Sequence, residues 1–239
     1  MRQEATHAID TAWKDRLLFS NDACMVINKL PGESSESINR QGDKFPTPVH
    51  RLDMPVSGCL LLARKSGAAA FLGAAFAGHE VEKHYWAIVE KPPKDAALPP
   101  SGELVHWLKE NRKANKSFAR AFGETSPNGQ RTRLKKAILR YRFIGEGDRY
   151  LFMEIDLVTG RRHQIRAQLA AIGLHIKGDL KYGARRSEKA GGIRLHAYSL
   201  AFPNPLAPEE TIRVKALPPV MDSLWIAFTK SVNTGSVDN

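Results

Sequence analysis

The chain has 239 residues, and its 42% hydrophobic and 26% charged content is typical of a globular protein. Its 36 lysines and arginines outnumber 25 acidic residues, so the net charge of +11 favours a polyanionic partner, with RNA or DNA first. No apolar run reaches the roughly 18 residues of a membrane helix, and the first residues lack the apolar segment of a signal peptide. The sequence therefore excludes a helical membrane span and predicts a cytoplasmic protein without membrane partners.

The first third of the chain reads as strands around a polar loop. Residues 1–15 are expected to form a short amphipathic helix or a loose arm, and 17–20 and 23–28 are two strands joined by a turn. Residues 29–49 contain prolines, glycines and serines, which indicate a loop, and loops often carry function. The apolar run 59–63 is typical of a buried strand. Cys24 and Cys59 lie in such apolar runs, so they are predicted to be core residues, not a disulfide or a zinc site.

A helix and a strand follow. Ser66 can cap a helix that ends at Gly78, and residues 83–89 suit a strand by their aromatic and β-branched content. Residues 109–136 carry nine lysines or arginines and few apolar residues, so an exposed basic loop is predicted there.

The second half of the chain is also rich in strands. A helix is expected after Gly160 and ends at Gly173. Strands are expected near residues 137–144, 150–157, 193–202 and 211–216. Because strands and helices do not alternate strictly, the pattern predicts an α+β fold with a mixed, largely antiparallel sheet and flanking helices. Residues 1–231 are predicted to form a single domain and residues 232–239 a mobile tail.

The strongest candidate for chemistry is the acid in His50-Arg51-Leu52-Asp53, directly before the apolar strand. A carboxylate held against an arginine stays ionised and can act as a nucleophile or base. On spacing alone, however, Asp53 is more often a turn residue.

A second segment, residues 159–166, supplies basic partners. Thr159 is placed to cap the helix, and Arg162 and Arg166, one turn apart, would project from one stripe of it. A helix start rich in arginine attracts anions. The alternative is that both arginines lie along the helix surface or hold phosphates nonspecifically.

Aromatic and histidine residues add weaker candidates. Tyr85 could stack on a base or donate its hydroxyl hydrogen, although a strand tyrosine is more often a core residue. His163, His175 and His196 lack the spacing of a metal site, so they are predicted to be structural or to contact RNA. No metal or cofactor is expected.

Five sequence blocks, in the same order, resemble the pseudouridine synthases of the RluA-like family. They are His50-Arg51-Leu52-Asp53 with Ser57-Gly58, then Lys83-His84-Tyr85-Trp86-Ala87, then Thr159 through Arg166, then Lys177 through Gly183, and Leu195-His196-Ala197. Such an ordered set is a specific signal. Three positions depart from the family pattern, with Val56 for threonine, His175 for proline and Gln168 for histidine. The resemblance covers the catalytic domain, and the small RNA-binding domain often fused ahead of it is not expected.

The resemblance implies an isomerase that converts specific uridines of ribosomal or transfer RNA to pseudouridine, without a cofactor and as a monomer. It implies that Asp53 is the catalytic aspartate, that Arg166 is its salt-bridge partner and that Tyr85 stacks on the flipped uracil. Leu195, or a neighbour in its strand, would pack on the other side of the base. The substrate-binding residues are then expected to be His50, Arg51, Leu52, Arg161, Arg162, His163, Gln164 and Leu195.

Several alternatives stay open at this point. A noncatalytic RNA-binding protein would keep the charge but would not need both Asp53 and Arg166. A kinase-like transferase is disfavoured, because no glycine-rich phosphate loop and no D-F-G segment accompany the His-Arg-x-Asp sequence. A hydrolase that uses Asp53 as nucleophile is harder to exclude. The sequence also does not choose between attack at C1′ and removal of the C2′ proton, nor between RNA targets.

Overall fold

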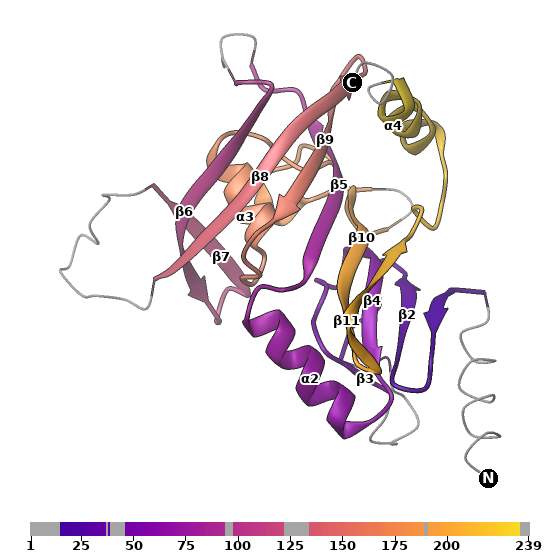
Figure 1. Cartoon of the computed structure of the whole chain (residues 1–239). Helices are drawn as coiled ribbons and strands as arrows, with labels where there is room; N and C mark the ends of the chain where they lie inside the picture. Colours follow the sequence, from indigo (N-terminus) through magenta and orange to yellow (C-terminus); the bar gives the residue numbers. More distant parts are fainter. Residues whose placement is uncertain are drawn as a thin grey trace. The chain divides into compact units, whose positions relative to one another are not determined.

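The computed structural model describes residues 15–36, 38, 46–93, 98–121, 134–188 and 191–234 (Figure 1). The chain divides into two compact units, one of residues 1–83 and 196–219 and the other of residues 84–195 and 220–239. Each unit is described by itself. The predicted arm at 1–15 lies almost wholly outside the described residues.

The first unit is built on a small sheet whose central strand is the predicted apolar run. The strand order is β1 (Leu17–Ser20), β2 (Cys24–Lys29), β4 (Ser57–Ala63) and β10 (Leu195–Asn204), with β3 (Thr47–Pro48) beside β4 and β11 (Ala207–Lys215) beside β10. The pairing of β4 with β10 is parallel and the others are antiparallel. Every residue of β4 is buried, which explains the unbroken apolar run at residues 59–63.

The helix α2 (Ser66–Ala77) packs against this sheet through Leu72 and Ala75. Cys24 and Cys59 are free and buried in the same core, as predicted. The helix has its predicted end at Gly78, but its start differs from the prediction. Its N-cap residue is Lys65 without a side-chain cap, so Ser66 is the first helical residue and not the cap.

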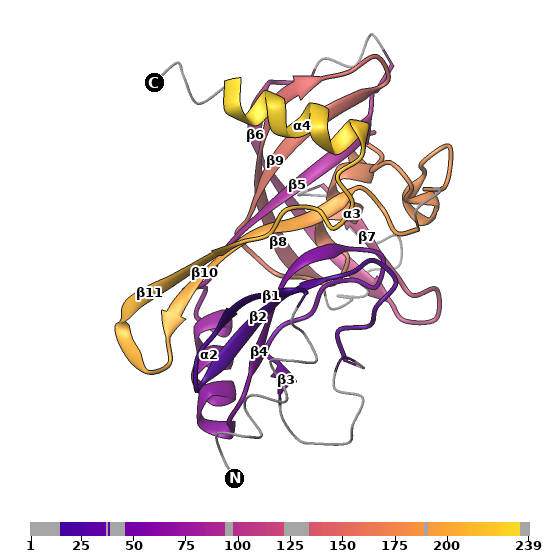
Figure 2. The ribbon, with the colours of Figure 1, turned by 90° about the vertical axis from the view of Figure 1, so that its right-hand side faces the viewer.

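The second unit is an antiparallel sheet with one helix on each face. Its strand order is β5 (Glu82–Glu90), β9 (Tyr150–Leu157), β8 (Lys135–Glu146), β6 (Ser101–Asn111) and β7 (Lys116–Arg120). The helix α3 (Gln164–Ala171) packs through Ala167 near Leu108 and Ala137. The helix α4 (Ser223–Thr234) packs on the other face (Figure 2). There the ring of Phe228 meets those of Trp86 and Phe152. A short 3-10 helix, η1 (Leu180–Tyr182), follows α3.

The predicted α+β class and its mixed, largely antiparallel sheet are confirmed. The predicted basic loop at 109–136 is wrong in part, because β6 runs to Asn111, β7 spans residues 116–120 and β8 begins at Lys135. The reversal between β6 and β7 is tight and places Asn115 at a positive φ of 47°. The helix α4 is not among the predicted elements, and it includes residues 232–234, which are predicted to belong to the mobile tail.

Candidate active site

Asp53 lies in the first unit at the start of a tight turn that leads into β4. The amide of Val56 donates to the Asp53 carbonyl at 2.9 Å. Directly before Asp53, Leu52 is buried, its amide donates to Ser35 Oγ at 3.1 Å, and the Ser35 hydroxyl donates to its carbonyl at 3.0 Å. The backbone is therefore fixed on both sides of the acid, which limits where the carboxylate can point.

Lys29, at the end of β2, holds the same turn from within. Its ammonium donates to the carbonyls of Leu30 at 2.9 Å, Glu33 at 2.9 Å and Met54 at 3.3 Å. The side chain is fully buried, and burial lowers its pKa to about 8, although the charges of Glu33 and Asp53 act to raise it. The ammonium and the Asp53 carboxylate thus attract each other. Lys29 is not among the predicted site residues, and its signal in the sequence is a lysine at the end of an apolar strand.

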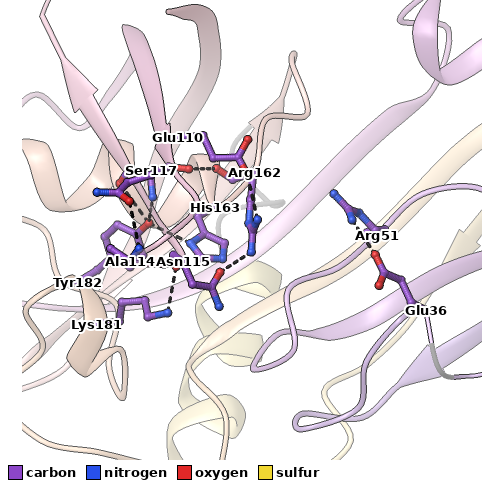
Figure 3. Close-up of polar contacts among 11 residues, drawn as sticks. Glu36, Arg51, Glu110, Ala114, Asn115, Ser117, Arg162, His163, Lys181 and Tyr182 are labelled. Atoms are coloured by element: carbon purple, nitrogen blue, oxygen red, sulfur yellow. Dashed lines mark hydrogen bonds and ion pairs between the residues drawn. The ribbon is translucent and has the colours of Figure 1, made fainter. Parts of the chain in front are cut away.

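His50 has a structural role in the same segment. Its Nε2 accepts a hydrogen bond from the Leu61 amide at 3.1 Å, and its ring stacks on Phe76 with centroids 4.8 Å apart. Burial, with the charge of Lys83, lowers its pKa to about 3, so the ring is neutral. Arg51 instead is exposed and pairs with Glu36 at 2.7 Å (Figure 3). Substrate binding by His50, Arg51 and buried Leu52 remains a prediction.

The strand that follows the turn is fixed by a buried serine–histidine contact. Ser57 Oγ lies 2.8 Å from His196 Nδ1, and His196 Nε2 lies 2.9 Å from the Ala216 carbonyl. Because only an N–H can bond to that carbonyl, Nε2 carries the hydrogen and Nδ1 accepts from Ser57. Burial lowers the His196 pKa to about 4. His196 is therefore structural, one of the two roles predicted for it.

Tyr85 and Arg166 lie in the second unit. Tyr85 is buried on β5 and shares a sheet face with Ile155, its partner on β9. Arg166 is buried on α3, where its Nε and Nη2 donate to the two carboxylate oxygens of Asp179 at 2.7 and 2.8 Å. Asp53 belongs to the first unit, so the meeting of these three residues at one site remains a prediction from the resemblance.

The predicted stripe of arginines on α3 is wrong. The helix begins at Gln164, and its N-cap residue His163 has a φ of 52°, so the chain turns sharply before the helix. Arg162 therefore precedes the helix and is partly exposed, donating to Glu110 at 2.9 Å and to Asn115 (Figure 3). The hydrogen bond from Arg162 lowers the pKa of Glu110. The two arginines consequently point to different surroundings, one exposed and one buried.

Thr159 also departs from its predicted capping role. Its hydroxyl donates to Gln164 Oε1 at 2.8 Å and accepts from the Ile138 amide at 2.9 Å. Gln164 Oε1 also accepts from the Arg161 amide at 2.9 Å, so Gln164 ties the turn to β8 from inside. The Arg161 side chain is exposed, and its Nε donates to the Lys136 carbonyl. Gln164 and Thr159 thus shape the turn that precedes Arg166.

Tyr182 connects this turn to the β6–β7 hairpin. Its hydroxyl accepts from the Ser117 amide at 2.8 Å and lies 3.1 Å from the Ser117 carbonyl and 3.0 Å from His163 Nδ1 (Figure 3). The guanidinium of Arg166 lies over its ring at 4.8 Å from the centroid. His163 contacts the Tyr182 hydroxyl and His175 the Tyr182 carbonyl, and substrate binding by His163 remains a prediction. Asp179 and Tyr182 were quoted in the resemblance but were given no role in the predicted site.

No helix in the described part of the chain is long and apolar enough to cross a membrane. No group of three or more histidines, cysteines or acids in that part is arranged to hold a metal ion.

Comparison with known proteins decides the family. Residues 19–171 match the family model described as RNA pseudouridylate synthase. A protein of Zymomonas mobilis named as an uncharacterized RNA pseudouridine synthase is 31% identical over 202 residues, which cover 77% of this chain and 86% of the relative. The chain belongs to the RNA pseudouridylate synthase family. The synthase is an isomerase, and the predicted RluA-like membership is confirmed.

Other relatives agree with this assignment. The synthase is 28% identical over 235 residues to tRNA pseudouridine synthase C of Haemophilus ducreyi, covering 87% of this chain and 92% of that one. It is 28% identical over 238 residues to ribosomal large subunit pseudouridine synthase C of Vibrio cholerae, covering 90% and 68%. The solved structure of human RNA pseudouridylate synthase domain containing 1 has the same fold, with a TM-score of 0.69 at 22% identity over 87% of this chain and 86% of that one.

Proposed function

We propose that this synthase isomerises uridines in ribosomal or transfer RNA and that Asp53 is the residue that acts on the ribose. The observation that carries the proposal is the braced turn, in which Ser35 and Lys29 hold the backbone around a single carboxylate. A fixed acid beside a buried ammonium is suited to a reaction that needs an ionised carboxylate. The relatives named for transfer RNA and for ribosomal RNA support both substrate classes.

The reaction moves one bond. The bond between N1 and C1′ breaks, the uracil turns, and C5 joins C1′, while N1 gains a proton and C5 loses one. Asp53 either attacks C1′ and is later released or removes the C2′ proton and later returns it. Arg166 would keep Asp53 ionised, Tyr85 would stack on the detached uracil and help to remove the C5 proton, and Leu195 would pack on the opposite side of the base.

The uridine has to leave its stack to reach the acid, at a cost of about a few kcal/mol. Contacts to phosphates can offset that cost. Arg51 and Arg162 suit this role, because each is exposed and holds an acid, Glu36 or Glu110, that a phosphate could replace. The remaining predicted substrate contacts, Arg161 among them, would surround the same nucleotide. We expect the synthase to work as a monomer in the cytoplasm.

Tritium release from RNA labelled at C5 of uridine tests the proposal. Wild-type protein is expected to release tritium from ribosomal or transfer RNA, and Asp53→Ala and Asp53→Asn are expected to abolish the release. Asp22→Asn, at the exposed turn between β1 and β2, is the matched control and should keep full activity. Full activity in both Asp53 variants would refute the proposed role of the acid.

Product analysis separates the rival activities. Digestion of the treated RNA should yield pseudouridine, whereas a hydrolase would yield free uracil and an abasic ribose. A noncatalytic RNA-binding protein would bind the RNA tightly without any release of tritium. Either of the last two results would overturn the proposed function.

A further inference from the structure

Cations and aromatic rings alternate on one face of the second unit's sheet, where β6, β7 and β8 lie together. We call this set the outer patch, and its members are Trp107, Lys109, Lys116, Phe118, Arg120 and Lys136. Successive residues of a strand point to opposite faces, and directly paired residues share a face. By this register the outer patch lies on the face opposite Tyr85.

The pairing surrounds each ring with positive charge. Lys109 is directly opposite Phe118, and Trp107 lies between Arg120 on β7 and Lys136 on β8. The ammonium of Lys116, two residues before Phe118 at the edge of the sheet, lies 5.5 Å from the centroid of that ring and 5.0 Å from the centroid of the Tyr182 ring. Phe118 is 43% exposed, which leaves much of its ring available for stacking.

The helices of the unit cover other parts of the sheet. Residues that alternate with the outer patch, such as Leu108 and Ala137, are buried against α3 on the opposite face. On the face of the outer patch, α4 lies across one end of the sheet (Figure 2). It packs on Trp86 of β5, Phe152 of β9 and Gly145 near the end of β8, whereas Lys136 lies at the beginning of β8. The exposure of Phe118 is therefore consistent with a part of the face that α4 does not cover.

On this face of the sheet, the charged side chains beside the outer patch form ion pairs, whereas those of the outer patch form none among the described residues. The neighbouring rows are neutralised by the cross-strand pairs Arg140–Glu103 at 3.0 Å, Arg142–Glu154 at 2.6 Å and His84–Asp156. Within the part of the chain that the structure describes, no acid forms an ion pair with Lys109, Lys116, Arg120 or Lys136. Four cations around two rings thus favour an external polyanion that also offers aromatic surfaces.

We propose that the outer patch binds a single-stranded segment of RNA, with bases on Phe118 and Trp107 and phosphates on the surrounding lysines and Arg120. Stacking on aromatic side chains and a positively charged surface are what single-stranded RNA requires of a binding site. The inference rests on the proposed function only in that this RNA is the substrate. Because the outer patch and Tyr85 lie on opposite faces, it contributes to binding and not to the chemical step.

The test compares two double variants that each lose one exposed apolar side chain and one positive charge. Phe118→Ala with Lys109→Gln removes the centre of the outer patch. Leu206→Ala with Lys215→Gln, on exposed residues of the β10–β11 hairpin, is the matched control. Single-stranded poly(U) is the binding probe, and tritium release from the substrate RNA gives KM and kcat.

We expect the outer-patch variant to bind poly(U) about tenfold more weakly, since one stacked base and one phosphate contact are lost. The slope of log affinity against log salt should fall by about 0.7. KM for the substrate RNA should rise while kcat at saturation stays unchanged, and the control variant should match the wild type in all three measurements. Photo-crosslinking of wild-type protein to 5-iodouridine RNA should label Phe118 or Trp107.

Equal affinity and KM in both double variants, with no crosslink on β6 or β7, would overturn the inference. Binding of an acidic protein, and not of RNA, at the outer patch would also overturn the inference. The Asp53→Ala variant separates this result from the proposed function, because it should lose tritium release and keep the affinity for poly(U). Failure of the proposed function would instead show as absent tritium release in the wild type.

Discussion

Arg166 on α3 and Asp179 before η1 form a two-point ion pair that is almost wholly buried. Their side chains are 6% and 1% exposed, and both carboxylate oxygens accept from the guanidinium. The ring of Tyr182 covers one face of the same guanidinium. A planar group held at two N–H bonds and over a ring has little freedom to turn. Asp179 and Tyr182 are therefore positioning residues for Arg166.

Replacement of Asp179 by asparagine should reduce both stability and kcat. It removes the charged carboxylate that pairs with the buried Arg166 guanidinium at two points, which costs about 3–5 kcal/mol of unfolding free energy. Urea denaturation measures that loss, and tritium release under saturating RNA measures kcat. The exposed Asp148, between β8 and β9, gives the control Asp148→Asn, which should stay within about 0.5 kcal/mol of the wild type. A loss below about 1 kcal/mol in Asp179→Asn would contradict the role given to the pair.

Removal of the Tyr182 hydroxyl should have a smaller effect on stability. Tyr182→Phe keeps the ring over Arg166 but leaves the buried Ser117 amide without its acceptor, at a cost of about 1–3 kcal/mol. Tyr150→Phe, at the start of β9, is the control and should change stability little. Hydrogen exchange of the Ser117 amide reports the same bond directly. Unchanged protection of that amide in Tyr182→Phe would refute the prediction.

His196 should make stability depend on pH below neutrality. Burial lowers its pKa in the folded protein from the ordinary 6.5 to about 4, so the unfolded chain binds a proton more readily. The buried neutral ring of His196 makes its full contribution to the free energy of unfolding above about pH 6.5. This contribution is lost as pH falls toward about 4, and the free energy of unfolding then decreases by about 1.4 kcal/mol per pH unit. Urea denaturation across this range should show a shallower slope in His196→Gln than in the wild type.

The exposed His79, just after α2, supplies the control for that slope. His79→Asn keeps a residue type that tolerates the positive φ of 62° and should leave the pH dependence as in the wild type. Parallel slopes in His196→Gln and the wild type would mean that other groups cause the pH dependence.

Some strands and helices could be predicted because their pattern of buried residues appears directly in the sequence. β4 is buried on both sides and contains the unbroken apolar run 59–63, and α2 ends at Gly78, where the sequence predicts its end. The β6–β7 hairpin was missed for the opposite reason. Its outer face carries cations, and its inner face buries few residues, among them Leu108 and Ser117, so the apolar alternation is too sparse to detect.

The site was predicted less completely than the fold. The candidate residues are recognisable as a set of motifs, but their contacts depend on backbone that the sequence does not reveal. Arg162 and Arg166 are four residues apart, yet the left-handed His163 places one of them outside the helix. Lys29 contacts the turn of Asp53 through carbonyl groups, which any sequence would offer. Contacts to backbone leave no pattern in residue types, so they appear only in the structure.

Gly58 should be irreplaceable, whereas the same substitution in α2 should be favourable. Its φ is +118°, and an added Cβ would lie 2.3 Å from the Ala197 carbonyl oxygen. Both the conformation and the close approach of β10 require glycine. Gly58→Ala should therefore destabilise the protein by more than the roughly 1 kcal/mol typical of a point mutation, as measured by urea denaturation.

Gly67, in the first turn of α2, is the matched control because a Cβ there would meet nothing within 4 Å. Gly67→Ala should stabilise the protein by about 0.5–1 kcal/mol, since alanine loses less backbone freedom in a helix. The two identical substitutions are thus expected to act in opposite directions. If Gly58→Ala were as stable as the wild type, β4 and β10 would have to lie farther apart at Gly58 and Ala197 than the structure places them. The close pairing of β4 with β10 would then not hold the strand that follows the turn of Asp53.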